Sequence, residues 1–145
     1  MTREEEDRKF WKNYDIKKPH RFVAHTTDSI TGLEIIPTYV IHTVERPTRY
    51  WKGEEHFWNP INIGVYEVLG FDILMKLNDV KRFTLRVQEI DSCGNVKEEW
   101  ELGSCRIEHL FPHDLSWCQN EDQPITLVCQ VSFKTVKVNT NIERK

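Results

Sequence analysis

Apolar and polar side chains alternate along most of the chain after residue 20, and this two-residue period is typical of half-buried β-strands. The clearest alternation covers segments 61–69, 82–90 and 124–134. The side chains that the pattern directs toward a core are Ile61, Ile63, Val65, Phe83, Leu85, Val87, Ile125, Leu127, Cys129, Val131 and Phe133. We therefore expect three strands here, each with one buried face.

Four further segments carry the β-branched and aromatic residues that strands favour. They are 21–26, 33–44, 96–102 and 104–111. Pro37 cannot donate a ladder hydrogen bond, so the second segment is expected to lie at an edge, to contain a bulge or to begin at Thr38. The run from Asp91 to Asn95 predicts a hairpin turn in which Gly94 or Asn95 has positive φ.

One short helix is expected between these strands, over residues 71–80. The side chains that would share one face of it are Phe71, Leu74, Met75 and Asn78. About seven evenly spaced strands and one helix predict a mainly β fold. The expected architecture is a small antiparallel β-barrel or sandwich with one short flanking α-helix.

The composition divides the chain into three sections. Residues 1–20 are a charged N-terminal arm, residues 21–135 hold the strand pattern, and residues 136–145 are a polar C-terminal tail that is expected to fray. The arm carries three aromatic residues at helix-compatible spacing: Phe10, Trp11 and Tyr14. Either the arm frays, or it docks these rings on a neighbouring molecule, because three aromatic rings are costly to leave in water.

Residues 45–60 combine prolines, a glycine and charges with aromatic side chains, and they predict a long loop. Its candidates for contact with a partner are Arg46, Tyr50, Trp51, Phe57 and Trp58. Because Trp, Tyr and Arg are enriched at protein interfaces, we interpret the loop as a surface that packs on another subunit. A nucleic-acid reader is the alternative, but Glu45, Glu54 and Glu55 weaken it.

The totals limit the class of protein. The 145 residues fit one domain, and a net charge of −3 argues against a surface built to grip nucleic-acid phosphates. No apolar run approaches the roughly 18 residues that a membrane span needs. No secretory signal is visible, so we expect synthesis in a cytoplasm, where the four cysteines would be reduced thiols.

Four potential metal ligands fall within one short stretch: Cys105, His109, His113 and Cys118. Cysteine and histidine bind zinc, but this spacing does not match the paired arms of common zinc sites. The competing interpretation is two core or interface thiols and two surface histidines. A cysteine nucleophile beside a histidine is a further alternative. With no phosphate-binding glycine loop and no nucleophile elbow, we expect no catalytic residue, no cofactor and no metal.

From residue 46 onward, the order of features resembles the tail tube proteins of contractile bacteriophages. An Arg-Pro element, Arg46-Pro47, precedes an aromatic-rich segment that ends in Trp58-Asn59-Pro60, and a strand follows. The most specific run is Asp91, Gly94, Val96, Trp100 and Leu102. The remaining elements are Cys105–Leu110, Asp114-Leu115-Ser116-Trp117, Glu121-Asp122 and Ile125–Phe133. Together they cover about two thirds of the chain.

The resemblance implies a ring-forming subunit with a fold similar to that of the type VI secretion tube. Six copies would form a ring around a lumen, and rings would stack into the virion tube through which the genome leaves. The face with Asn62, Gly64 and Tyr66 is a candidate lumen lining. The implied partners are further copies, the tail sheath protein, and baseplate and neck proteins. Viral DNA would pass without specific binding, and no membrane is implied.

The chain departs from the family pattern in three places. The segment between Leu69 and Lys81 is short, Pro112-His113 precedes the Asp-Leu pair where many members have Phe-Gly, and four cysteines are more than expected. These departures leave open a tube-initiating ring at the baseplate or a terminator ring at the neck. Two thiols, Cys93 and Cys118, are candidates for cross-links between subunits.

Overall fold

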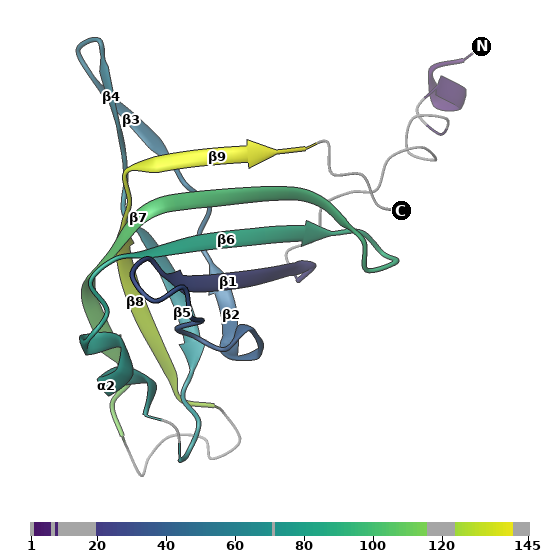
Figure 1. Ribbon diagram of the computed structural model, residues 1–145. Coiled ribbons are helices and arrows are strands. Elements are labelled where there is room, and N and C mark those ends of the chain that lie inside the picture. The colour runs from purple at the N-terminus through teal and green to yellow at the C-terminus, as the bar shows by residue number, and fades with distance from the viewer. Residues whose placement is uncertain (1, 7, 9–19, 71, 116–123, 141–145) are drawn as a thin grey trace.

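The chain folds into a mainly β structure with short helices, as expected (Figure 1). The computed structural model describes residues 2–6, 8, 20–70, 72–115 and 124–140, and residues 3–6 are helical. The other elements are β1 (Phe22–Asp28), the 3₁₀ turn η1 (Thr38–Val40), β2 (Ile41–Val44), β3 (Arg49–Lys52), β4 (Glu55–Trp58), β5 (Ile61–Tyr66), α2 (Ile73–Asn78), β6 (Phe83–Ile90), β7 (Val96–Pro112), β8 (Thr126–Ser132) and β9 (Thr135–Asn139). Every pair of named strands is antiparallel.

The long strand β7 joins two layers of sheet. The strand order is β1-β6-β7-β8-β5-β2, with β9 paired to β7 as well. The first part of β7 pairs with β6 and β9, and its last part pairs with β8. We call β1, β6, β9 and the first part of β7 sheet A, and β2, β5, β8 and the end of β7 sheet B; β3 and β4 form a separate pair. Figure 1 shows sheets A and B crossing. Because the described strands do not close into a barrel, the sandwich is the better description.

Two residues form the bend of β7. The segments 96–102 and 104–111, expected as two strands, are one strand that turns at Gly103 and Ser104. Ser104 has φ +53, a left-handed conformation that is uncommon outside glycine. A side chain at Gly103 would place its Cβ 2.3 Å from Thr135 Oγ1, so only glycine fits there without movement.

The core lies between the inner faces of sheets A and B, where the predicted alternation is confirmed. Every side chain that the three patterned segments direct inward is buried, except Ile125. Ile125 is 37% exposed because it precedes the first residue of β8. Val96 and Trp100 are buried as expected for β7. One apolar cluster therefore joins both layers.

The helix is present, but the face predicted for it is wrong. Asp72 caps α2 by accepting a hydrogen bond from the Met75 amide at 3.1 Å, and this start directs Ile73 and Leu77 into the core. Met75 is 60% exposed, and Phe71 lies outside the described residues. Leu74 packs against the edge of the core. No helix among the described residues is long and apolar enough to cross a membrane.

Two segment boundaries also differ from the prediction. Segment 33–44 is a strand only from Ile41, because the Val40 amide bonds to the Pro37 carbonyl at 3.2 Å and closes a 3₁₀ turn. The tail does not fray over Thr135–Asn139, which forms β9. That segment pairs with the open edge of β7, so backbone hydrogen bonds order it, and Val136 packs against the core.

Candidate assembly surfaces

Residues 45–60, expected as a loop, contain a β-hairpin. Strands β3 and β4 pair antiparallel around a two-residue turn in which Gly53 has φ +66. At its base, the Asn59 amide donates to the Thr48 carbonyl at 2.9 Å, and Asn59 Nδ2 donates to Thr48 Oγ1 at 3.1 Å. A glycine turn between two aromatic runs is the signal that could have revealed it.

Strand parity gives the hairpin two aromatic faces. The first carries Arg49, Trp51, His56 and Trp58, and the second carries Tyr50, Lys52, Glu55 and Phe57. On the first, the Arg49 guanidinium lies 5.0 Å from the Trp58 ring centre, and the Trp51 and His56 rings are 5.1 Å apart. On the second, Tyr50 and Phe57 stack at 5.5 Å.

The hairpin is fixed at its base and exposed beyond it. Trp58 is partly buried and lies 5.8 Å from the core residue Phe133. Trp51 is 64% exposed, and Tyr50 and Phe57 are also exposed. Figure 1 shows β3 and β4 projecting beyond the two sheets. An exposed aromatic arm of this kind is typical of a surface that a partner covers.

The sequence candidates for partner contact fall into two groups. Arg46, Tyr50, Trp51, Phe57 and Trp58 all lie on or beside the hairpin. The arm residues Phe10, Trp11 and Tyr14 lie outside the described residues, as does Cys118. The roles of all of these as contact residues remain predictions.

Open strand edges are a second candidate surface. Among the described strands, β1 and β9 are the outer strands of sheet A, and β2 and the last part of β7 are the outer strands of sheet B. An outer strand leaves a row of backbone N–H and C=O groups free to pair with another chain. On β9, Val138 is also 59% exposed.

The outer face of sheet B is partly aromatic. A Cβ at Gly64 would lie 2.7 Å from His42 Cε1, so the His42 ring covers this position. The His42 and Tyr66 rings are 4.3 Å apart, and His42 Nδ1 lies 2.7 Å from Thr43 Oγ1. Burial lowers the pKa of His42, which favours the neutral ring. The face with Asn62, Gly64 and Tyr66 therefore also carries the His42 ring, and its role as a lumen lining stays a prediction.

The outer face of sheet A is polar and carries an ion pair. Arg86 Nε lies 3.0 Å from Glu99 Oε1 on the neighbouring strand. His25 Nε2 lies 3.3 Å from Gln88 Oε1. Such a face can remain in contact with water without exposing apolar area.

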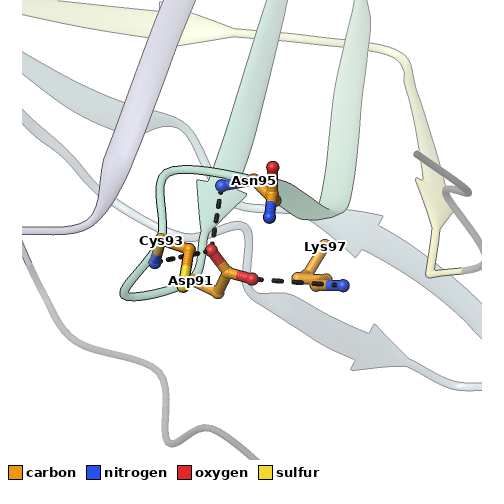
Figure 2. A network of polar contacts seen from close by, with 4 residues as sticks. All are labelled: Asp91, Cys93, Asn95 and Lys97. Atoms are coloured by element: carbon orange, nitrogen blue, oxygen red, sulfur yellow. Dashed lines mark hydrogen bonds and ion pairs between the residues drawn. The ribbon is translucent and has the colours of Figure 1, made fainter. Parts of the chain in front are cut away.

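The turn between β6 and β7 presents one exposed thiol (Figure 2). Asp91 Oδ1 accepts hydrogen bonds from the Cys93 and Asn95 amides, each at 2.9 Å, and Asp91 Oδ2 lies 4.0 Å from Lys97 Nζ. Gly94 has φ +85, which confirms one of the two expected turn positions. The side-chain bonds of Asp91 hold Cys93 at the tip of an ordered turn.

The three potential zinc ligands that the structure describes do not form a metal site; Cys118 lies outside the described residues. Cys105 is buried in the core, and its thiol donates to the Leu102 carbonyl at 3.2 Å. His109 stacks beside Phe111 at 5.7 Å, and His113 lies on the surface with its Nδ1 2.8 Å from the Asp114 carbonyl oxygen. No group of three metal-binding side chains is present in the described part of the chain.

The buried thiols are also unsuited to nucleophilic chemistry. Burial raises the pKa of Cys105 and of Cys129 to about 12. A nucleophilic cysteine needs a lowered pKa, because the thiolate is the reactive form. These two residues are core side chains, as the strand pattern predicts for Cys129.

Comparisons with known proteins identify the fold. No protein-family model and no curated protein matches this sequence. A chain of the anti-feeding prophage baseplate structure, "6-fold symmetrised", superimposes with a TM-score of 0.63 and 8% identity over 87% of this chain and 97% of that one. A chain of the PVC sheath–tube complex, from an extracellular contractile injection system in its extended state, has a TM-score of 0.59 and 14% identity. This match covers 86% of this chain and 92% of that one. Hcp1 from Salmonella typhimurium has a TM-score of 0.55 and 11% identity, over 81% of this chain and 85% of that one. At these identities the likeness establishes architecture, and this chain has a tail-tube-like fold.

Proposed function

We propose that this chain is a structural subunit of a phage tail tube, in which six copies form a ring and rings stack around a lumen for genome passage. The observation that carries the proposal is the tail-tube-like fold, which spans nearly the whole length of the chains that it matches. A baseplate and a sheath–tube complex are assemblies of many subunits, so a structural and non-enzymatic role fits best.

The open edges of the two sheets supply a route to ring closure. An outer strand of one copy pairs with an outer strand of the next, and this heterologous contact repeats until the ring closes. Closure also removes free strand edges, which would otherwise promote aggregation. The outer strands β9 of sheet A and β2 of sheet B are available for this pairing, whereas residues 33–35 already bond to part of the outer edge of β1.

The outer face of sheet A is our candidate for the lumen lining, in place of the face with Tyr66. Arg86 lies 3.0 Å from Glu99, and Lys137 lies opposite Glu101 on the neighbouring strand, so acidic side chains offset the positive charges that this face would offer DNA phosphates. The outer face of sheet B exposes more apolar area, including Tyr66 and Phe111, and suits contact with protein. DNA would then pass without specific binding.

The partners in this proposal are further copies, the tail sheath protein, and baseplate and neck proteins, and the location is the virion. The contacts expected to hold copies together are Arg46 and the hairpin aromatics, with Phe10, Trp11 and Tyr14 of the N-terminal arm. Cys93 and Cys118 are the candidate thiols for cross-links between subunits. Exposure of Cys93 at an ordered turn supports the first of these.

The second candidate function is a tube-initiating ring at the baseplate, or a terminator ring at the neck. The likeness to a baseplate chain favours it specifically. Such a protein forms one ring and does not polymerise alone. The purified full-length protein separates these functions when its mass in solution is measured and particles are imaged by negative stain. Stacked rings support the tube, single rings support the initiator or terminator, and a persistent monomer at high concentration contradicts both.

A further inference from the structure

A small pocket lies where β6 and β7 cease to pair, and we call it the basic pocket. The pairing of the two strands ends at Phe83 and Cys105. The pocket has a volume of about 320 Å³ and is lined by Val80, Lys81, Arg82, Arg106 and Ile107. Lys81 and Arg82 belong to the segment that runs from α2 to the start of β6 in Figure 1, and Arg106 follows the bend of β7. Three cationic side chains therefore line one hollow in a chain whose net charge is −3.

Positive charge exceeds negative charge at the basic pocket. Arg106 Nε lies 3.9 Å from Glu108 Oε1, and this is the one ion pair that the three cations form within the described part of the chain. The same Glu108 oxygen accepts a hydrogen bond from Ser132 Oγ at 2.7 Å, so the carboxylate is shared. Three positive charges around one shared negative charge repel one another. A bound anion would remove that repulsion.

The basic pocket also holds hydrogen-bond donors in place. Arg82 Nη1 donates to the Ser104 carbonyl at 3.3 Å, which fixes the guanidinium beside the bend of β7 and leaves its other N–H groups for a ligand. Beyond Cys105, the edge of β7 that faced β6 has no strand partner among the described residues, so its backbone groups are also accessible. Val80 and Ile107 pack against the core and give the pocket apolar walls. Such walls strengthen the attraction between opposite charges, because they lower the local dielectric.

We propose that the basic pocket binds a dianionic phosphate group, as inorganic phosphate or as the terminal group of a small phosphomonoester. Lys81 supplies a compact positive charge, and Arg82 and Arg106 supply planar donor forks that match phosphate oxygens. Three cations less the charge of Glu108 leave an excess of two, which matches a phosphomonoester at neutral pH. A DNA phosphodiester carries one charge and should bind more weakly. The pocket lies within one chain, so binding is expected whether or not rings form.

Thermal unfolding of the purified full-length protein measures this binding. A ligand that binds only the folded chain raises its Tm. Inorganic phosphate at ten times its Kd should raise the Tm by roughly 3–6 °C over sodium chloride of equal ionic strength. Adenosine monophosphate carries the same terminal group and should give a similar rise. If neither anion raises the Tm above that of the chloride control, the proposed site is wrong.

Two substitutions assign the binding to the pocket. Lys81→Ala and Arg106→Ala should each raise the Kd for inorganic phosphate about tenfold, because each removes a charged donor. Both residues are exposed, so each variant should keep the Tm of the unchanged protein in chloride. Arg82 is left in place because it also bonds to Ser104. Lys52→Ala is the matched control, since it removes an equal charge from an exposed position on the hairpin and should leave the Kd unchanged. Equal weakening by Lys52→Ala would reveal general attraction to positive charge and would overturn the site.

Hydrogen exchange shows where the phosphate binds. Inorganic phosphate should slow amide exchange in the peptides that cover residues 80–82 and 106–107. Slowing only in other peptides would place the anion elsewhere and contradict the proposal. Single-stranded DNA at the same phosphate concentration and salt should protect these peptides less. Stronger protection by DNA would assign the pocket to a nucleic-acid backbone and overturn the small-molecule ligand. Each of these failures leaves the proposed ring-forming function intact, because the oligomeric state is measured separately.

Discussion

At the scale of single residues, the bend of β7 depends on two residues, Gly103 and Ser104, whose backbone role the period-two pattern could not predict. In the sequence Gly103 predicts a break between two strands, but in the structure it lies inside β7, where it pairs directly with Thr135 of β9. The inward positions of β5, β6 and β8 were predictable, since alternation alone decides them. The contact of Gly103 with Thr135 joins two strands far apart in the chain, so local pattern carries no sign of it.

The bend gives a test by substitution. Gly103→Ala should lower the free energy of unfolding by about 1–3 kcal/mol, because its Cβ would overlap Thr135 Oγ1. Thr135→Ala removes that oxygen and should restore most of the loss in the double variant. Denaturant unfolding measures all three proteins. Equal losses in Gly103→Ala and in the double variant would show that Thr135 is not the obstacle.

The buried thiols predict how stability depends on pH. Burial raises the pKa of Cys105 and Cys129 in the folded chain to about 12, from an ordinary value near 9. The unfolded chain therefore loses these protons first, so the free energy of unfolding falls as the pH rises from about 9 to about 12. Below pH 9 the contribution is fully present. The slope reaches at most about 1.4 kcal/mol per pH unit for each thiol.

Cys129→Ala isolates this effect. Its free energy of unfolding should fall less steeply above pH 9 than that of the unchanged protein, measured by denaturant titration at several pH values. Alkylation provides a second readout. At pH 8, peptide masses should show Cys93 modified in the folded protein, and Cys105 and Cys129 modified only after unfolding. Rapid native labelling of either buried thiol would contradict their burial.

At the scale of elements, the hairpin shows where sequence pattern loses information. Prolines and charges around residues 45–60 indicated a loop. In the structure, the aromatic runs on either side of Gly53 form two strands, and Gly53 lies in the turn between them. Their aromatic residues occupy both faces, so no single inward face produces a clear alternation. The segment was still recognised as a candidate partner surface, because exposed aromatic residues carry that signal without a defined conformation. Strand β9 was missed although Val136 and Val138 alternate with polar residues in the period of a strand, because the segment is short and takes its order from pairing with β7.

A shortened hairpin separates folding from assembly. Deletion of Trp51-Lys52 and Glu55-His56 joins the Gly53-Glu54 turn directly to Tyr50 and Phe57, which removes one pair of residues from each strand and keeps the register. Trp58 remains packed on Phe133. The free energy of unfolding should change by less than about 1 kcal/mol, because the deleted residues are exposed.

Its assembly should change much more. The shortened protein should form rings but no stacks, as sedimentation and electron microscopy can measure. Tyr39→Ala, which removes an exposed aromatic ring elsewhere, is the control and should stack normally. Stacks of normal length from the shortened protein would show that the hairpin tip has no part in stacking.

At the scale of the whole molecule, the fold separates surfaces by direction. The hairpin and α2 lie toward opposite ends of the molecule, while the outer strands lie at the sides of the two sheets. A subunit with an exposed aromatic hairpin at one end and outer strands at its sides has surfaces for both stacking and ring closure. The sequence predicted the mainly β fold and a tail-tube resemblance, since both depend on the order of strands. The sequence could not predict which surfaces of neighbouring copies contact each other, because those contacts form between chains.

The most direct test of the central claim is the number of chains in the assembled particle. Native mass spectrometry of the purified full-length protein, taken over a range of concentrations, measures that number. The account predicts a species of six chains that persists on dilution, together with multiples of six where rings stack. A single chain at every concentration would contradict it.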